Sequence, residues 1–146
     1  MASLIKAKRR RGLAVVEMAL VFPMLMLLTV ALLEYGWMFL KSQQVNQAAR
    51  QGARAWARVD GTTGTAATAA ADAFGQSSSS MPTGYSIAYS YTGNQANPAA
   101  GGATVTVTVT GTYSTIRLLP TLSTTFLPVP DQLTGRVSMM KEGPSS

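Results

Sequence analysis

The feature that most constrains this chain is an apolar segment too long and too continuous for a small soluble domain. Residues 18–33 contain no charged side chain, and the flanking residues 13–16 and 35–40 are mostly apolar as well. A helix needs about 20 residues, at about 1.5 Å each, to cross a hydrocarbon core of about 30 Å. Residues 13–33 meet that length and place Glu17 and Glu34 toward the two ends, where a carboxylate costs less than at the midplane. The sequence therefore predicts one membrane-spanning helix.

Charge is distributed unevenly around this segment. Five of the 12 Lys and Arg residues precede Leu13 and no acid does, whereas the remaining seven face six acids, a net charge of 7 − 6 = +1. A basic flank favours a cytoplasmic N-terminus. A nucleic-acid-binding protein needs its positive charge on a folded face, so the sequence argues against a nucleic-acid partner.

A cleaved secretory signal is the first alternative to a membrane anchor. The apolar core is longer than a signal-peptide core of about 7–15 residues, and no small-x-small cleavage site follows it. These two departures favour a retained single-pass span.

Residue types that support catalysis are missing. The chain has no cysteine and no histidine, which excludes thiolate chemistry and the commonest general base and metal ligand. The six acids are scattered, with no spacing suited to metal binding or to an acid–base pair. We therefore expect no enzyme, no metal, no cofactor and no small-molecule substrate.

The helix is predicted to continue beyond the membrane to residue 59. Residues at intervals of three and four form one apolar face of this helix, and the small residues among them allow close packing. This face consists of Val45, Ala49, Gly52, Trp56 and Val59. A second stripe follows at i, i+4 and i+8: Arg50, Arg54 and Arg58. Like charges at this spacing oppose each other slightly, so tertiary contacts must hold this stem.

The remaining chain predicts a short helix and a small antiparallel sheet. Residues 65–76 are alanine-rich and predict a helix, whereas residues 85–92 and 104–110 alternate large apolar with small or polar side chains, as half-buried strands do. Residues 133–139 are a weaker third strand. The fold class is α+β, with a three- or four-stranded sheet packed on a long N-terminal transmembrane helix. The apolar loop 114–130 either covers the sheet or forms a docking surface.

The predicted organisation has three parts. Residues 1–12 form a basic cytoplasmic leader, residues 13–60 the transmembrane helix with its stem, and residues 61–146 an extracytoplasmic α+β domain.

The N-terminal half resembles a known family over residues 11–58. The resemblance rests on Arg11-Gly12-Leu13, then Val16-Glu17-Met18 with Pro23, Glu34-Tyr35-Gly36, and residues 48–54 (AARQGAR). This combination is similar to TadE-like pseudopilins, which are minor pilin-like proteins of the tight-adherence (Tad, Flp-type) pilus and secretion apparatus. Met18 stands where major Flp pilins usually carry tyrosine, which fits a minor subunit. The resemblance implies a pilin-like fold.

The resemblance also implies a maturation step and an assembly contact. A prepilin peptidase cuts between Gly12 and Leu13, and Glu17 becomes the fifth residue of the mature chain. Its carboxylate then pairs with the new α-amino group of Leu13, across subunits or within one, in helix packing that serves pilus assembly and adherence. An interfacial acid that reaches headgroup water is the alternative for Glu17, and a plain flexible joint is the alternative for Gly12.

Two further groups of residues have open roles. Glu34, Tyr35 and Gly36 either mark the outer membrane boundary or form a helix–helix contact at the glycine. The stripe of Arg50, Arg54 and Arg58 either pairs with a partner's acids or with headgroups, or is simply solvated.

Expected partners and location follow from the same resemblance. The partners are other pilin-like subunits, Tad inner-membrane assembly proteins, the prepilin peptidase and the membrane. The location is the bacterial inner membrane, with an outer domain, and the surface pilus is a possible destination. The competing hypotheses are an uncleaved, signal-anchored envelope protein that displays a small β-rich binding module, and an exported enzyme.

Overall fold

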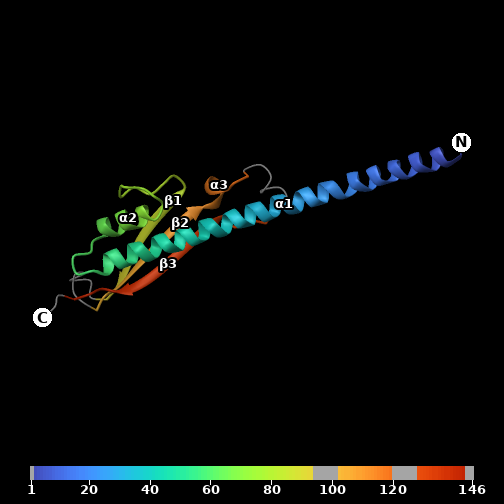
Figure 1. Ribbon diagram of the computed structural model, residues 1–146. Coiled ribbons are helices and arrows are strands. Elements are labelled where there is room, and N and C mark those ends of the chain that lie inside the picture. Colours follow the sequence, from blue (N-terminus) through green and yellow to red (C-terminus); the bar gives the residue numbers. More distant parts are fainter. Residues whose placement is uncertain (1, 94–101, 120–127, 144–146) are drawn as a thin grey trace. The chain divides into compact units, whose positions relative to one another are not determined.

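The computed structural model of the chain describes residues 2–93, 102–119 and 128–143, and for residues 2–11 it describes the backbone (Figure 1). Its elements, in chain order, are α1 (Ala2–Ala57), α2 (Thr63–Asp72), β1 (Tyr85–Thr92), β2 (Thr104–Thr112), α3 (Tyr113–Ile116) and β3 (Gln132–Met140). Contacts divide the chain into two units, Met1–Gly36 and Trp37–Ser146.

The helix α1 starts earlier than the sequence predicted. It begins at Ala2 rather than at Leu13, and it ends at Ala57, two residues before the predicted end. Residues 2–11 contain neither glycine nor proline and are rich in Ala, Lys and Arg, which are good helix formers. Pro23 lies inside the helix, which remains helical on both sides of it.

In the unit Trp37–Ser146, three strands form an antiparallel sheet in the order β1-β2-β3. The first pair is in register from Tyr85↔Gly111 to Thr92↔Thr104, and the second from Thr104↔Met140 to Thr112↔Gln132. The α+β fold class is confirmed, with a long apolar N-terminal helix and a small sheet. The strand predictions are confirmed as well, since β1 has the predicted bounds and β2 and β3 are longer by one or two residues at their ends.

One face of the sheet carries the core. The strictly alternating strand β2 buries its valines on this face, and the stem part of α1 buries small residues and one tryptophan against it. These residues are Val105, Val107 and Val109 from β2, and Val45, Ala48, Ala49, Gly52, Ala53, Trp56 and Ala57 from α1. Four of the five residues predicted for the apolar face are buried, but Val59 is exposed because α1 ends before it.

Glycines permit the close approach of α1 to its neighbours. A Cβ added at Gly52 would lie 3.1 Å from the Ala66 carbonyl oxygen and 3.3 Å from Val107 Cγ1. A Cβ at Gly135 on β3 would lie 2.7 Å from the Val45 carbonyl oxygen. The helix backbone therefore rests almost directly on β3 and on α2.

The helix α2 lies on the same face of the sheet as the stem (Figure 1). Its start is fixed by a capping box, in which the Thr62 and Thr65 side chains each accept a hydrogen bond from the other residue's backbone N–H. It ends at Asp72, earlier than the predicted residue 76, and Gly75 then takes a positive φ of 74°. The Phe74 ring, just after this helix end, packs against the Tyr85 ring, with the two ring centroids 4.4 Å apart.

The predicted apolar loop contains structure at its start. Residues 113–116 form α3, and the Trp37 indole N–H donates to the Ile116 carbonyl oxygen at 2.7 Å. The rest of this loop from 120 to 127, and most of the hairpin connection predicted between β1 and β2, lie outside the described residues.

We expect Gly52 and Gly36 to respond differently to alanine, although both lie in α1. Gly52→Ala should have a free energy of unfolding about 1 kcal/mol lower than that of Gly36→Ala, because its Cβ would lie 3.1 Å from the Ala66 carbonyl oxygen and its neighbours would have to shift. Gly36→Ala should be neutral or stabilising by up to about 1 kcal/mol, since a Cβ there meets nothing within 4 Å and alanine is the better helix former. Thermal unfolding of the two variants in detergent checks this, and equal stability of the two would contradict the close contact at Gly52.

Candidate assembly interface

The apolar segment of α1 presents its side chains outward on all sides. Every residue from 12 to 29 is exposed, including twelve large apolar residues from Leu13 to Leu28. An exposed apolar surface of this extent is unstable in water and marks contact with lipid or with another protein. By length and composition, Gly12–Ala57 contains one candidate membrane span.

Gly12 and Leu13 lie within α1, where the charged leader meets the apolar segment. Space around Gly12 is open, since an added Cβ would meet nothing within 4 Å. Packing within the chain therefore does not require a glycine here. A glycine does weaken a helix locally by about 1 kcal/mol relative to alanine, so the backbone at this junction opens more readily than its neighbours.

Glu17 lies one helical turn beyond Leu13. Its side chain is exposed, and the i, i+4 spacing puts it on the same face of the helix as Leu13. The axial separation of the two residues is about 6 Å. A carboxylate at this position is close enough to interact with a positive charge at residue 13 or with a neighbouring helix.

Glu34, Tyr35 and Gly36 differ in exposure although they are consecutive. The Glu34 side chain is fully buried, while Tyr35 and Gly36 are exposed. A Cβ at Gly36 would meet nothing within 4 Å, so this glycine is available for a close contact with another helix.

Two residues with interfacial character follow at once. The Lys41 ammonium lies 4.7 Å from the centroid of the Trp37 ring, in a cation–π contact, and also donates to Gln44 Oε1 at 3.1 Å. Tryptophan and lysine are typical of the headgroup level of a membrane protein.

The predicted arginine stripe is exposed along its whole length. Arg50, Arg54 and Arg58 all have exposed side chains, and they lie away from the buried face of the stem. Arg54 is in the last turn of α1, where a cation interacts favourably with the helix dipole. Arg50 is a turn further from that end and gains less from it.

The C-terminal end of α1 is held by a residue that the sequence analysis did not single out. The buried Lys141 ammonium donates to the carbonyl oxygens of Trp56 at 3.1 Å, Arg58 at 3.0 Å and Gly61 at 2.9 Å. The Glu142 backbone N–H donates to the Ala57 carbonyl oxygen at 2.7 Å. The residues that follow β3 thus hold the last turn of α1 and the turn after it through backbone carbonyl groups.

Two tyrosines of β1 have buried hydroxyl groups. The hydroxyl oxygens of Tyr85 and Tyr89 have no hydrogen-bond partner among the described residues, and burial raises the pKa of both side chains. The Tyr89 ring packs edge-on against Trp56, with centroids 5.5 Å apart. Both rings therefore pack against the core through aromatic contacts.

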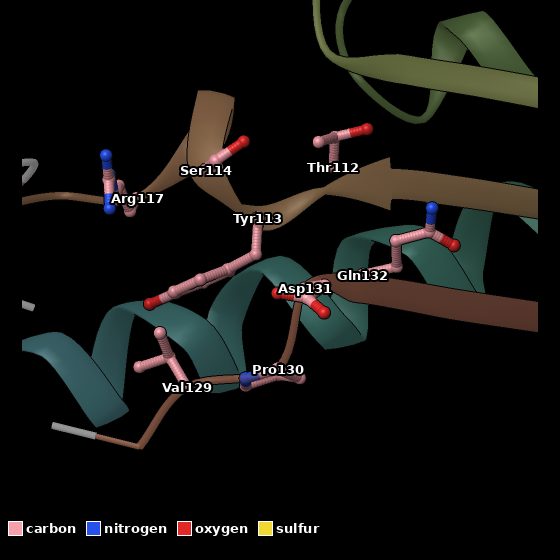
Figure 2. Close-up of a pocket in the computed structure, with 8 residues that line it drawn as sticks. All are labelled: Thr112, Tyr113, Ser114, Arg117, Val129, Pro130, Asp131 and Gln132. Atoms are coloured by element: carbon pink, nitrogen blue, oxygen red, sulfur yellow. The ribbon is translucent and has the colours of Figure 1, made fainter. Parts of the chain in front are cut away.

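A cavity of about 210 Å³ opens between α3 and the start of β3 (Figure 2). The Tyr113 side chain lies across it, between Arg117 and the Val129–Pro130 segment. The nearest acid, Asp131, is exposed. The described residues include no group of three or more His, Cys, Asp or Glu that could hold a metal ion. The lining offers no pairing of a nucleophile with a base.

Comparison with known proteins shows a family resemblance in the N-terminal part of the chain. A family model described as "TadE-like protein" matches residues 12–54. This segment is similar to the TadE-like family. The match begins at the junction glycine and ends at Arg54, so it covers Glu17, the apolar segment and most of the stem. Neither a curated protein nor a solved structure gives a significant match to the chain.

The TadE-like family is a structural, Tad-pilus-associated family and not an enzyme family. The long apolar helix fits a single-pass membrane anchor in such a system. Along α1, the residues singled out by the sequence form a series and not one cluster. Gly12, Leu13 and Glu17 lie at one end of the apolar segment and Glu34 to Gly36 at the other. Arg50 and Arg54 lie on the stem, and Arg58 follows its end.

We expect Lys141→Met to destabilise the unit Trp37–Ser146 by about 2–3 kcal/mol, since the carbonyl groups at the end of α1 lose a charged donor in a buried site. Thermal unfolding in detergent measures the loss. Glu142→Gln is the matched control, because its side chain is exposed and its backbone bond survives. Equal unfolding temperatures for the two variants would contradict the capping role.

The tyrosine hydroxyls predict a dependence of stability on alkaline pH. Because burial raises the pKa of Tyr85 and Tyr89 in the folded chain, their stabilising contribution is complete below the unfolded value of about 10 and is lost as the pH rises above it. The variant Tyr85→Phe/Tyr89→Phe should be as stable as the parent at pH 7 and should lose less stability between pH 9 and pH 11. Tyr91→Phe serves as the control for loss of one tyrosine. Identical alkaline curves for the parent and the double variant would contradict the prediction.

Proposed function

We propose that this protein is a minor pilin-like subunit of a Tad (Flp-type) pilus or secretion apparatus. It is held in the bacterial inner membrane by residues 13–33, with its N-terminus in the cytoplasm and residues 61–146 outside. A prepilin peptidase cuts it between Gly12 and Leu13, and the mature helix then packs with other pilin-like subunits and with Tad inner-membrane assembly proteins. Through this packing it supports pilus assembly and adherence.

The observation that carries the proposal is the exposed apolar segment with Glu17 at its start, within the stretch matched by the TadE-like family. A helix that served only as an anchor needs no acid one turn into the span. An ionised carboxylate there is costly unless it has a partner. Cleavage after Gly12 creates such a partner, the α-amino group of Leu13, on the same face of the helix and one turn away.

Pairing can occur within one chain or between neighbouring chains. Within a chain, the carboxylate also interacts favourably with the free N–H groups at the new helix start. Between chains, it aligns one helix along the next and fixes their register. In both cases the pairing follows cleavage, because residue 13 has no charge before it.

The stem extends the proposed contact outside the membrane. Arg50 and Arg54 lie 9 and 13 residues beyond Lys41 on the stem, which is about 14–20 Å along a helix. That distance places the stripe beyond the headgroups that Trp37 and Lys41 can reach. We propose that its partner is an acidic face of another subunit.

We expect Glu17→Ala to uncouple maturation from assembly. The variant should insert in the membrane and start at Leu13. Its amount in the sheared surface fraction should fall at least about tenfold, which corresponds to a change of about 1.4 kcal/mol in the assembly equilibrium. Glu17→Gln should behave in the same way because the charge is what matters. Val16→Ala, an apolar neighbour, should assemble normally. Normal surface levels of the Glu17→Ala variant would contradict the proposed pairing.

We also expect the joint change of Arg50, Arg54 and Arg58 to Gln to weaken co-purification of the other Tad subunits, and high salt to weaken it in the parent. The single change Arg50→Gln separates binding from local stability, because Arg50 is the furthest of the three from the end of α1. It should reduce recovery of the partner and leave the unfolding temperature unchanged. An unaltered complex with the triple variant would mean that the stripe is merely solvated.

A further inference from the structure

Strand β1 is an open edge of the sheet. It pairs with β2 on one side, and no other strand pairs with it within the described part of the chain. The stem part of α1 and the helix α2 cover one face of the sheet, the face that carries the core. The side chains on the opposite face of β1 are small and exposed, namely Ser86, Ala88 and Ser90.

The backbone groups that point away from β2 can be identified. The Thr112 N–H donates to the Gly84 carbonyl oxygen at 2.8 Å. Inward and outward directions alternate along an antiparallel strand, so the N–H and C=O groups of Ile87, Tyr89 and Tyr91 point outward. The same alternation places the Tyr85 N–H outward, and it donates to the Pro82 carbonyl oxygen at 3.1 Å. Beyond that bond, no described backbone group pairs with the edge.

Features that normally protect a sheet edge are missing from β1. Natural edges carry charged side chains, prolines or bulges, or are very short. Over its eight residues β1 keeps an unbroken register with β2, and it contains no charge and no proline. No charged residue lies anywhere between Asp72 and Arg117. The opposite edge strand, β3, contains Arg136 and is contacted by α1 at Gly135.

We propose that the β1 edge accepts an extended, uncharged segment of another pilus subunit by strand addition. The added strand would bond to the outward groups of Ile87, Tyr89 and Tyr91. Its side chains on the core face would continue the row of tyrosine and isoleucine, and those on the other face would continue the row of serine and alanine. A charged side chain on the core face would lose its hydration without finding an opposite charge in β1.

The direction of the stem argues against a second copy of this chain as the occupant. The Trp37 end of the stem lies at the start of β1, because Trp37 bonds to Ile116 and Ile116 lies 3.1 Å from the Cβ position of Gly84. The Ala57 end lies at the other end of β1, through Glu142 and the Lys141–Ala103 pairing next to Gly93. The stem and β1 therefore run in the same direction.

If a second copy added its own β1 antiparallel to this edge, its stem would run opposite to the stem of the first copy. Antiparallel pairing of two copies would therefore turn their stems in opposite directions, and parallel pairing is weaker per residue. The favoured occupant is a strand of a different subunit, which runs antiparallel to β1 as β2 does.

Because the chain has no cysteine, a single introduced thiol reports on this edge. We would attach a benzophenone maleimide to Ser90→Cys on β1 in full-length protein, in membranes of pilus-producing cells, and illuminate it. The control is Thr134→Cys on β3, which is also exposed. The expected result is a cross-link from position 90, and not from position 134, to a segment of another pilus subunit that lacks charged residues. A cross-link only to a second copy, equal cross-linking at both positions, or no cross-link would overturn the proposal.

A second experiment introduces charged side chains on the β1 edge. Ala88→Lys/Ser90→Lys should reduce the cross-linked or co-purified subunit by about tenfold with no change in unfolding temperature, because edge lysines oppose strand addition. Thr134→Lys/Met140→Lys, at exposed positions of β3, should have no such effect.

This inference rests on the proposed function only for the identity of the partner, and the two can fail separately. The chain could start at Leu13 and assemble in a Glu17-dependent way while the edge variants leave cross-linking and co-purification unchanged. In that case only the proposed strand addition is wrong. If the chain keeps residues 1–12 and never reaches the pilus, the proposed function falls instead.

Discussion

The close packing of α1 on the sheet is the contact on which the rest of the structure depends. It is possible because glycine or alanine occupies the positions where the backbones meet, at Gly52 on the helix and at Gly135 on β3. At this distance the valines of β2 and Trp56 fill a thin core, and the Lys141 side chain can reach the carbonyl groups at the end of α1. A side chain at Gly52 would crowd the Ala66 carbonyl oxygen and Val107, so the neighbours of the stem would have to shift by a few tenths of an ångström.

The same helix must also be stable in a second environment. Its apolar segment exposes Leu, Val, Met and Phe side chains in every direction, whereas its stem buries small residues on one face and exposes arginines on another. Small residues suit packing on the sheet, and large apolar residues suit lipid or neighbouring helices. The change between these compositions near Trp37 coincides with the boundary of the two contact units.

Much of this architecture could be predicted from local patterns, and what was missed depends on distant contacts. Alternation in residues 85–92 and 104–110 was sufficient for the strands, since one face of each is buried. The early start of α1 at Ala2 was not predicted because residues 2–11 have no periodic apolar pattern, although their Ala, Lys and Arg residues are good helix formers. Nothing near Lys141 in the sequence points to the end of α1, about 80 residues away. Its one signal was a lone lysine directly after the last strand.

Maturation tests the central claim most directly, because the proposed role of Glu17 depends on a new amino group at Leu13. The measurement is the intact mass and N-terminal sequence of the membrane-extracted protein, from cells with and without the prepilin peptidase. The account predicts a chain that starts at Leu13 only when the peptidase is present. A chain that starts at Met1 or Ala2 in both strains would contradict it and leave a plain membrane anchor.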